Sequence, residues 1–182
     1  MVGVFEIELK ALLSMEKYAE LLELLPRMMR LVNAETMNTT KFCSTGMDIR
    51  LRWSERTFEL VAKDGKATDV SRREITIPLG SKIDVENLIM IFQSLGIKED
   101  HPWITHRKDF EYEYNSYTYK ASLQHIENFA YILEIEYTSA DGDGKDIHEK
   151  NIREIFEELG LEAVDDKQFT KMIKEYIKNY KK

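Results

Sequence analysis

Apolar and charged residues alternate along the first part of the chain, which predicts a β-strand. The segment FEIELKA, residues 5–11, places Glu6, Glu8 and Lys10 between apolar neighbours. This period of two gives the strand one apolar face and one ionised face. Shorter alternating segments recur, separated by the turn-forming stretches SERT, KDGKAT and YNS. The pattern predicts strands over residues 2–11, 36–43, 47–53, 57–63, 70–78, 103–114, 117–126 and 129–138.

Four further segments carry apolar residues at helical spacing. Ser14 is the expected N-cap of the first helix, and Pro26 is expected to kink that helix or divide it in two. The second helix is expected to begin at Ser81 or Asp84 and to end at Gly96. The spacing predicts helices over residues 14–32, 81–96, 146–160 and 165–182. Strands and helices together predict an α+β fold, an antiparallel β structure decorated with helices.

Length, composition and charge narrow the class of protein. A chain of 182 residues is expected to form a single domain, 1–182, because that length suits one core. A hydrophobic content of 43% is typical of a globular protein, and the net charge of −7 argues against nucleic acid as a partner. The only cysteine, Cys43, excludes an internal disulfide and a cysteine-based zinc site. We see no signal peptide or membrane span and expect a cytoplasmic monomer or homodimer with no membrane partner.

The ionised faces of the strands leave two arrangements open. Arg50 and Arg52 oppose apolar residues in one strand, and Glu134 and Glu136 do so in the last. Such charges usually face water, and a small barrel more commonly turns its apolar face inward. Here four amphipathic helices also need an apolar surface to cover, which the outer faces of the strands would supply. The ionised faces would then line the lumen, which is tolerable only if the lumen is wet and binds ions.

An ionised lumen of this kind predicts a site for a metal-bound polyphosphate. Arginine binds phosphate oxygens bidentately and lysine adds a point charge, whereas carboxylates supply the hard oxygens that Mg²⁺ or Mn²⁺ prefers. The predicted phosphate-binding residues are Lys10, Arg50, Arg52, Lys63, Arg72, Arg107 and Lys120. The predicted metal ligands are Glu6, Glu8, Glu74, Glu134 and Glu136.

The order of the charged motifs resembles that of the CYTH domains, the triphosphate tunnel metalloenzymes, which include class IV adenylyl cyclases and thiamine triphosphatases. The motifs are ExExK at Glu6, Glu8 and Lys10, RxR at Arg50 and Arg52, a strand ending in Lys63, RxE at Arg72 and Glu74, Arg107, and ExE at Glu134 and Glu136. The resemblance implies an eight-stranded antiparallel β-barrel, the triphosphate tunnel, with amphipathic helices packed outside. The C-terminal helices would pack on the barrel over about residues 146–182. The lumen would bind a triphosphate group and one or two divalent cations.

The leading hypothesis is divalent-metal-dependent hydrolysis of inorganic triphosphate or of a triphosphorylated small molecule, such as ATP or thiamine triphosphate. The predicted catalytic residues are Lys10, Glu8 and Glu136. Lys10 would neutralise phosphate charge, and one of the two glutamates would coordinate the metal or activate water.

Two alternative functions stay open. A class IV-type adenylyl cyclase would hold ATP with the same residues and release cyclic AMP and pyrophosphate. A non-catalytic polyphosphate- or nucleotide-binding module is the other, because Thr76 and Gln124 stand where the family carries acids. The cyclase needs a base pocket, and we expect Trp53 and Trp103 on the exterior of the barrel instead.

Overall fold

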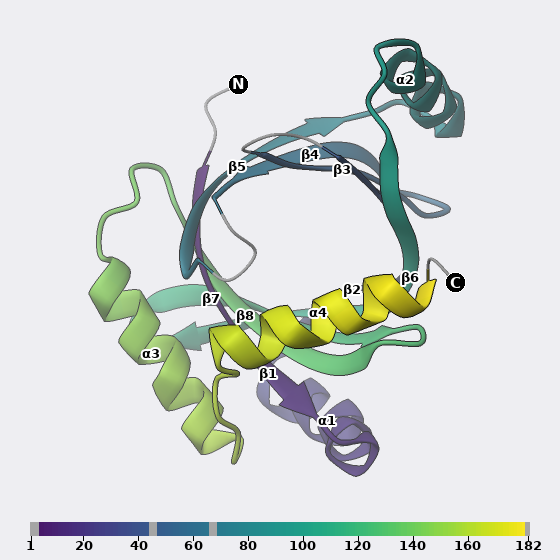
Figure 1. Cartoon of the computed structure of the whole chain (residues 1–182). Coiled ribbons are helices and arrows are strands. Elements are labelled where there is room, and N and C mark those ends of the chain that lie inside the picture. The colour runs from purple at the N-terminus through teal and green to yellow at the C-terminus, as the bar shows by residue number, and fades with distance from the viewer. Residues whose placement is uncertain (1–3, 44–46, 66–68, 181–182) are drawn as a thin grey trace.

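The strands close into a barrel in which every neighbouring pair is antiparallel. The computed structural model describes residues 4–43, 47–65 and 69–180. Around the ring the strand order is β1, β5, β4, β3, β2, β6, β7 and β8, and β8 pairs with β1 to close it (Figure 1). The bounds are β1 Val4–Leu13, β2 Arg30–Phe42, β3 Met47–Trp53, β4 Phe58–Asp64, β5 Ser71–Pro78, β6 Glu99–Tyr114, β7 Tyr117–Ile126 and β8 Ala130–Ser139. The predicted α+β fold and eight-stranded antiparallel barrel are confirmed.

The helices lie outside this ring. Their bounds are α1 Met15–Met28, α2 Lys82–Ser94, α3 Lys145–Glu158 and α4 Asp166–Tyr180. Figure 1 shows α1, α2 and α3 around the wall of the barrel, whereas α4 crosses one of its mouths. None of these described helices is both long and apolar enough to cross a bilayer.

The main hydrophobic core lies between the outer wall of the barrel and the helices. Ile7 of β1 is fully buried and belongs to one apolar cluster with Leu21 and Leu25 of α1 and Ile152 of α3. Burial of these side chains is the principal force that holds the helices on the barrel. Because successive residues of a strand point to opposite faces, an apolar outer wall directs the charged residues of the same strands into the lumen.

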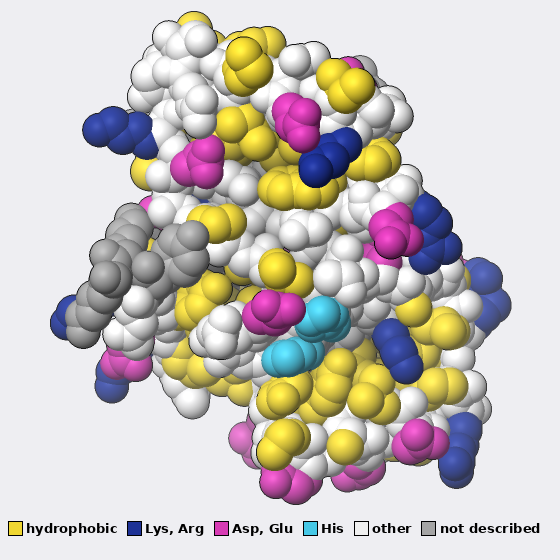
Figure 2. Space-filling model, turned by 90° about the vertical axis from the view of Figure 1, so that its right-hand side faces the viewer, with side chains coloured by type: hydrophobic (Ala, Val, Ile, Leu, Met, Phe, Trp, Pro, Cys, Tyr) yellow, Lys and Arg dark blue, Asp and Glu magenta, His cyan; other side chains and the backbone are white. Residues whose placement is uncertain are grey.

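A second, smaller cluster lies under α2. Phe42 and Leu51 on the barrel wall pack with Val85 of α2. Some apolar side chains of this helix are also exposed, among polar ones, as in the upper part of Figure 2, and Leu95 just beyond its end is 70% exposed.

The first helix and the second strand differ from the prediction. The helix was expected over residues 14–32, but α1 ends at Met28, and Met29 already has extended backbone angles. Pro26 does not divide α1 in two, because it lies in the last turn of one uninterrupted helix. Proline removes one hydrogen bond to the preceding turn and its ring crowds the carbonyl there, so it is best tolerated near the end of a helix. The residues that follow pair with β6, so β2 begins six residues earlier than predicted.

The remaining boundaries agree with the prediction to within a few residues. Ser14 is the N-cap of α1 and accepts a hydrogen bond from the backbone N–H of Lys17 at 3.1 Å. Ser81 occupies the N-cap position of α2, and Gly96 follows that helix with a φ of 75°. The predicted strand 2–11 and helix 165–182 each include two residues that lie outside the described part of the chain.

Truncation of a side chain in the outer core tests this inside-out arrangement. We expect Ile152→Ala in α3 to lower the free energy of unfolding by about 2–4 kcal/mol, because the side chain is fully buried. Ile147→Ala is the matched control in the same helix: Ile147 is 55% exposed, so the loss should stay below about 0.5 kcal/mol. Equal losses in urea unfolding would contradict the assignment of the core to the exterior of the barrel.

Candidate active site

The interior of the barrel forms one charged cavity of about 530 Å³. All of the residues that the sequence predicts as phosphate or metal ligands lie on its wall. They are Glu6, Glu8, Lys10, Arg50, Arg52, Lys63, Arg72, Glu74, Arg107, Lys120, Glu134 and Glu136. They come together because side chains alternate between the two faces of a strand. In each strand these residues lie on the face toward the lumen, and the apolar residues of the outer core lie on the opposite face.

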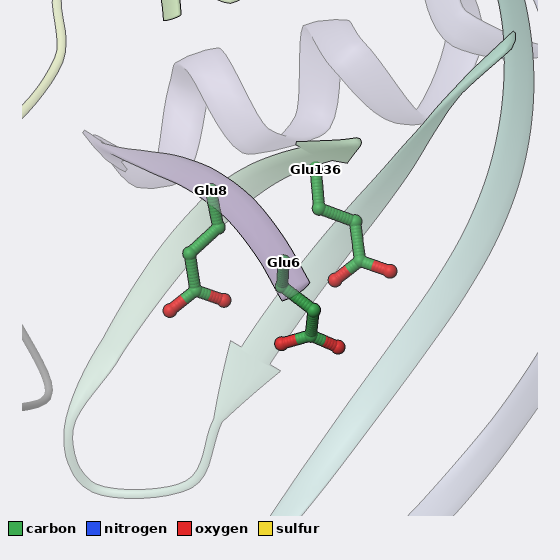
Figure 3. Close-up of side chains that lie close together, drawn as sticks. All are labelled: Glu6, Glu8 and Glu136. Carbon is green, nitrogen blue, oxygen red and sulfur yellow. The ribbon is translucent and has the colours of Figure 1, made fainter. Parts of the chain in front are cut away.

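Three carboxylates from two adjacent strands form the most compact acidic group in the cavity. Glu6 and Glu8 lie two residues apart on β1, and strand pairing sets Glu8 directly opposite Glu136 of β8. One carboxylate oxygen from each lies within 4.8 Å of the others, and the side chains converge from the two strands (Figure 3). Two oxygens bound to one octahedral Mg²⁺ are about 3–4 Å apart, so small rotamer changes would bring this group into ligand geometry.

Lysine side chains hold these acids together. The ammonium group of Lys63 on β4 pairs with Glu6, lies 2.9 Å from Glu74 and lies 3.6 Å from Glu8. Lys10 lies 2.8 Å from Glu8 and 3.1 Å from Glu134. The cluster therefore has its own counterions, which lower the repulsion between neighbouring carboxylates.

Arginines on the wall of the lumen are also paired with acids. Arg50 donates to both oxygens of Asp48, at 3.0 and 2.5 Å, and Arg107 donates to Asp109 at 2.7 Å. Arg52 lies 3.3 Å from a carboxylate on the neighbouring strand. These guanidinium groups are thereby fixed in orientation around the cavity, and their remaining N–H groups are suited to oxygen ligands.

Arg72 has donors that lack an acceptor. Its side chain on β5 is 4% exposed, and one terminal nitrogen pairs with Glu8. Among the described residues no hydrogen-bond acceptor reaches its Nε and Nη1 atoms. Buried polar groups are nearly always hydrogen-bonded, so two orphaned donors in a charged cavity indicate a place for an oxygen-rich ligand.

Burial and neighbouring charges change the pKa values of the acidic cluster in different directions. Burial, the adjacent Glu136 and Glu74 raise the pKa of Glu6 to about 8, against the opposing effect of Lys63. Burial and the charge of Glu134 likewise raise the pKa of Glu136. For Glu8 burial acts in the same upward direction, but Lys10, Lys63 and Arg72 outweigh it and hold the pKa well below its ordinary value. The cluster therefore combines one carboxylate whose ionised form is favoured with two whose protonated form is favoured.

One mouth of the cavity is covered by apolar and aromatic side chains. Phe169, Ile173 and Tyr176 of α4 line it from outside, and Phe129 of the β7–β8 turn lies 5.1 Å from Tyr176 between ring centroids. The segment before α4 is tied to the barrel where the backbone N–H of Val164 donates to the carbonyl of Lys10 at 2.7 Å.

Several lining residues were not predicted from the sequence. Trp103 was expected outside but lies on the cavity wall, with its ring centroid 5.5 Å from the guanidinium carbon of Arg50. Trp103 lies four residues before Arg107 and therefore on the same face of β6. The alternation of the sequence thus already indicated that its side chain faces the lumen. Lys41 of β2 also lines the cavity, and its stretch TTKFCST has no clear alternation that would have shown this. Trp53 is outside as expected and packs in the cluster beneath α2.

Comparisons with known proteins support the fold at low sequence identity. No family model matches the chain, and no curated protein matches it significantly in sequence. The structure is similar to that of the PH1819 protein of Pyrococcus horikoshii, with a TM-score of 0.73 and 19% identity over 93% of this chain and 98% of that one.

Two bacterial structures described as a "putative adenylate cyclase" are also similar. The protein of Vibrio parahaemolyticus gives a TM-score of 0.71 at 12% identity, over 94% of this chain and 99% of that one. The protein of Bacillus halodurans gives a TM-score of 0.57 at 17% identity, over 91% and 95% of the two chains. At such identities the likeness shows a shared fold.

The raised pKa of Glu6 predicts a specific dependence of stability on pH. A group that holds a proton more tightly when folded stabilises the protein below its unfolded pKa, and this contribution is lost as pH rises toward about 8. In buffer containing a chelator, the free energy of unfolding should therefore fall between pH 5 and pH 7 by roughly 2 kcal/mol more in the wild type than in Glu6→Gln. Parallel stability curves for the two proteins would show that Glu6 is ionised throughout.

Proposed function

We propose that the chain is a divalent-metal-dependent triphosphatase that acts on inorganic triphosphate or a triphosphorylated small molecule within the barrel lumen. The observation that carries the proposal is the compact group Glu6, Glu8 and Glu136 in the same cavity as Arg72, two of whose nitrogens have no acceptor among the residues the structure describes. Carboxylates are the ligands of a hard cation, and arginine donors are suited to phosphate oxygens. The resemblance of the charged motifs to CYTH domains supports the proposal, which includes a single CYTH-like domain over residues 1–182.

The residues present fit a metal ion of this kind. Glu6, Glu8 and Glu136 offer only oxygen ligands, and they leave coordination positions open for water and phosphate oxygens, as Mg²⁺ and Mn²⁺ prefer. Glu74 and Glu134 lie farther along the same walls and could hold a second ion. A bound divalent cation would neutralise the charge on the phosphate chain and on its leaving group.

The ion pairs of the lumen suggest how metal and triphosphate assist each other. Lys10 and Lys63 are both held by carboxylates of the acidic group. If those carboxylates held a cation, their attraction for the lysines would be weaker, and the ammonium groups of the lysines would be available to phosphate. The basic residues would then bind the phosphate chain together, with Arg50, Arg52, Arg72, Arg107 and Lys120 on the surrounding walls.

The two glutamates with opposite pKa shifts suit different tasks. Glu8, whose pKa is held low, stays ionised and is suited to hold the cation. Glu136, whose pKa is raised by burial and by the charge of Glu134, holds a proton more readily and is better suited to accept one from an attacking water. Lys10 is placed to stabilise the negative charge that develops on phosphate.

Adenylyl cyclase activity is the second candidate function. Two structurally similar proteins are described as a "putative adenylate cyclase", and the same cavity could hold ATP while its own 3′-hydroxyl attacks the α-phosphate. Incubation with tripolyphosphate and with ATP, each with Mg²⁺ or Mn²⁺, separates the candidates by phosphorus NMR. Orthophosphate and pyrophosphate from tripolyphosphate would establish the hydrolase, whereas cyclic AMP and pyrophosphate from ATP would establish the cyclase. Binding without turnover would indicate a non-catalytic module.

Removal of individual charges should reduce turnover without unfolding the protein. We expect Lys10→Ala and Glu136→Ala each to lower kcat by about 100-fold or more, because each removes a contact made to the reacting phosphate or water. Lys82→Ala and Glu86→Ala are the matched controls, since this pair lies exposed on α2. Steady-state assays with a check of secondary structure by circular dichroism provide the measurement. Unchanged turnover in both lumen variants would refute the site.

Metal and triphosphate should bind with positive coupling. Titration calorimetry should show tripolyphosphate binding at least about tenfold more weakly with a chelator than with Mg²⁺, because without the cation the lysines remain paired with Glu8 and Glu6. In Glu8→Gln that metal dependence should shrink, since the carboxylate that links the two sites is gone. An affinity independent of the metal in the wild type would contradict the coupling.

A further inference from the structure

Two histidines lie next to each other on the outer wall of the barrel. His106 of β6 and His125 of β7 are far apart in the sequence, but strand pairing sets them directly opposite each other. Their rings are stacked with centroids 5.5 Å apart, and Figure 2 shows two histidine side chains side by side at the surface. Since the next residue of one strand, Arg107, and the preceding residue of the other, Gln124, line the lumen, the two imidazoles point away from it.

A carboxylate lies beside this histidine pair. Glu127 follows β7 in the turn to β8, and its Oε1 lies 2.8 Å from Nε2 of His106. The backbone N–H of Glu127 donates to the carbonyl of Ile104 at 3.0 Å, which fixes the start of the turn on β6. The side chain of His106 is 44% exposed and that of Glu127 is 39% exposed, so ions in solution have access to this group.

The other ring nitrogen of His106 has a partner that would orient it as a metal ligand. Its Nδ1 lies 3.0 Å from Oγ1 of Thr36, which stands directly opposite on β2. A histidine that binds a metal through one ring nitrogen usually donates a hydrogen bond from the other, which fixes the tautomer and the orientation of the ring. In the tautomer whose Nδ1–H donates to Thr36, the lone pair of Nε2 faces Glu127 and is available to a cation between them.

Small movements of these side chains would admit a metal ion. Two ligands of one tetrahedral Zn²⁺, each about 2.1 Å from the ion, lie about 3.4 Å apart, so His106 and Glu127 need to separate by roughly half an ångström. The ring of His125 must turn out of its stack with His106 and Tyr131 to point a nitrogen at the ion. It lies within reach, since directly opposite residues of antiparallel strands have Cβ atoms about 4.5–5.5 Å apart. Because His125 is only partly buried, solvent can replace the contacts that its ring gives up.

We infer that His106, His125 and Glu127 form a binding site for Zn²⁺ or a similar divalent transition metal on the outer wall of the barrel. Two imidazoles and one carboxylate suit Zn²⁺ or Cu²⁺, whereas the oxygen ligands of the lumen suit Mg²⁺ or Mn²⁺. The exposed position leaves a fourth coordination position to water. A bound ion would tie the β7–β8 turn to β6, and this turn carries Phe129 at the mouth of the lumen. The inference stands independently of the proposed function.

Copper and zinc binding by the untagged protein tests this site. In the presence of excess Mg²⁺, electron paramagnetic resonance of one equivalent of Cu²⁺ should show coupling to two nitrogen nuclei, which carboxylate ligands do not give. His106→Gln and His125→Gln should each reduce this to one nitrogen and weaken Zn²⁺ binding at least about tenfold in titration calorimetry. Glu127→Gln should keep both nitrogens and weaken Zn²⁺ binding by a similar factor.

A control and a double variant make the outcome decisive. Glu86→Gln changes an exposed carboxylate of α2 and should leave the copper spectrum and the zinc affinity unchanged. The other two histidines, His101 and His148, are buried, so nitrogen coupling should vanish in the double variant His106→Gln/His125→Gln. Nitrogen coupling that survives in the double variant, its absence from the wild type, or equal Zn²⁺ affinity of the two proteins would overturn the site. Turnover of triphosphate is a separate measurement, and its failure would leave this site intact.

Discussion

The structure depends on mutual neutralisation of the charges that the strands turn inward. An ionised side chain inside a barrel loses much of its hydration, and the loss is tolerable only when opposite charges lie close by. Here each strand contributes to that balance: Lys63 from β4 is shared by Glu6 of β1 and Glu74 of β5, and Lys10 lies between Glu8 and Glu134. With the charges accommodated inside, the apolar faces are left outside, where the helices cover them.

The same ion pairs bear on which ligand the lumen would accept. A bare cation meets carboxylates that already have lysine partners, and a bare phosphate chain meets arginines and lysines that already have carboxylate partners. A ligand that supplies both charges at once exchanges one set of ion pairs for another and leaves no group without a partner. This balance is the physical basis of our proposal that the lumen binds a metal–polyphosphate complex, and Arg72 adds donors that are unpaired within the described residues.

The sequence predicts this inventory well because inward parity is a local property of a strand. Glu6, Glu8 and Lys10 point inward together once one of them does, and the same holds along β8. The same alternation places Trp103 on the lumen face of β6 with Arg107. The prediction that Trp103 lies outside the barrel was wrong because an aromatic residue was assumed to be exterior. The alternation within one strand does not show which strands become neighbours. The approach of Glu136 to Glu6 and Glu8 depends on barrel closure, and the position of α4 over a mouth depends on tertiary packing that its amphipathic stripe does not specify.

The protein itself compensates much of the negative charge of the acidic group. Three carboxylates within a few ångströms repel one another, and ordinarily a cation is needed to hold them. In this barrel Lys63 supplies part of that cation, and the raised pKa values of Glu6 and Glu136 allow a proton to supply the rest. A metal ion would then displace the proton without a large rearrangement of the strands. Its affinity should accordingly rise with pH through the range in which Glu6 loses its proton, because metal and proton compete for the same oxygens.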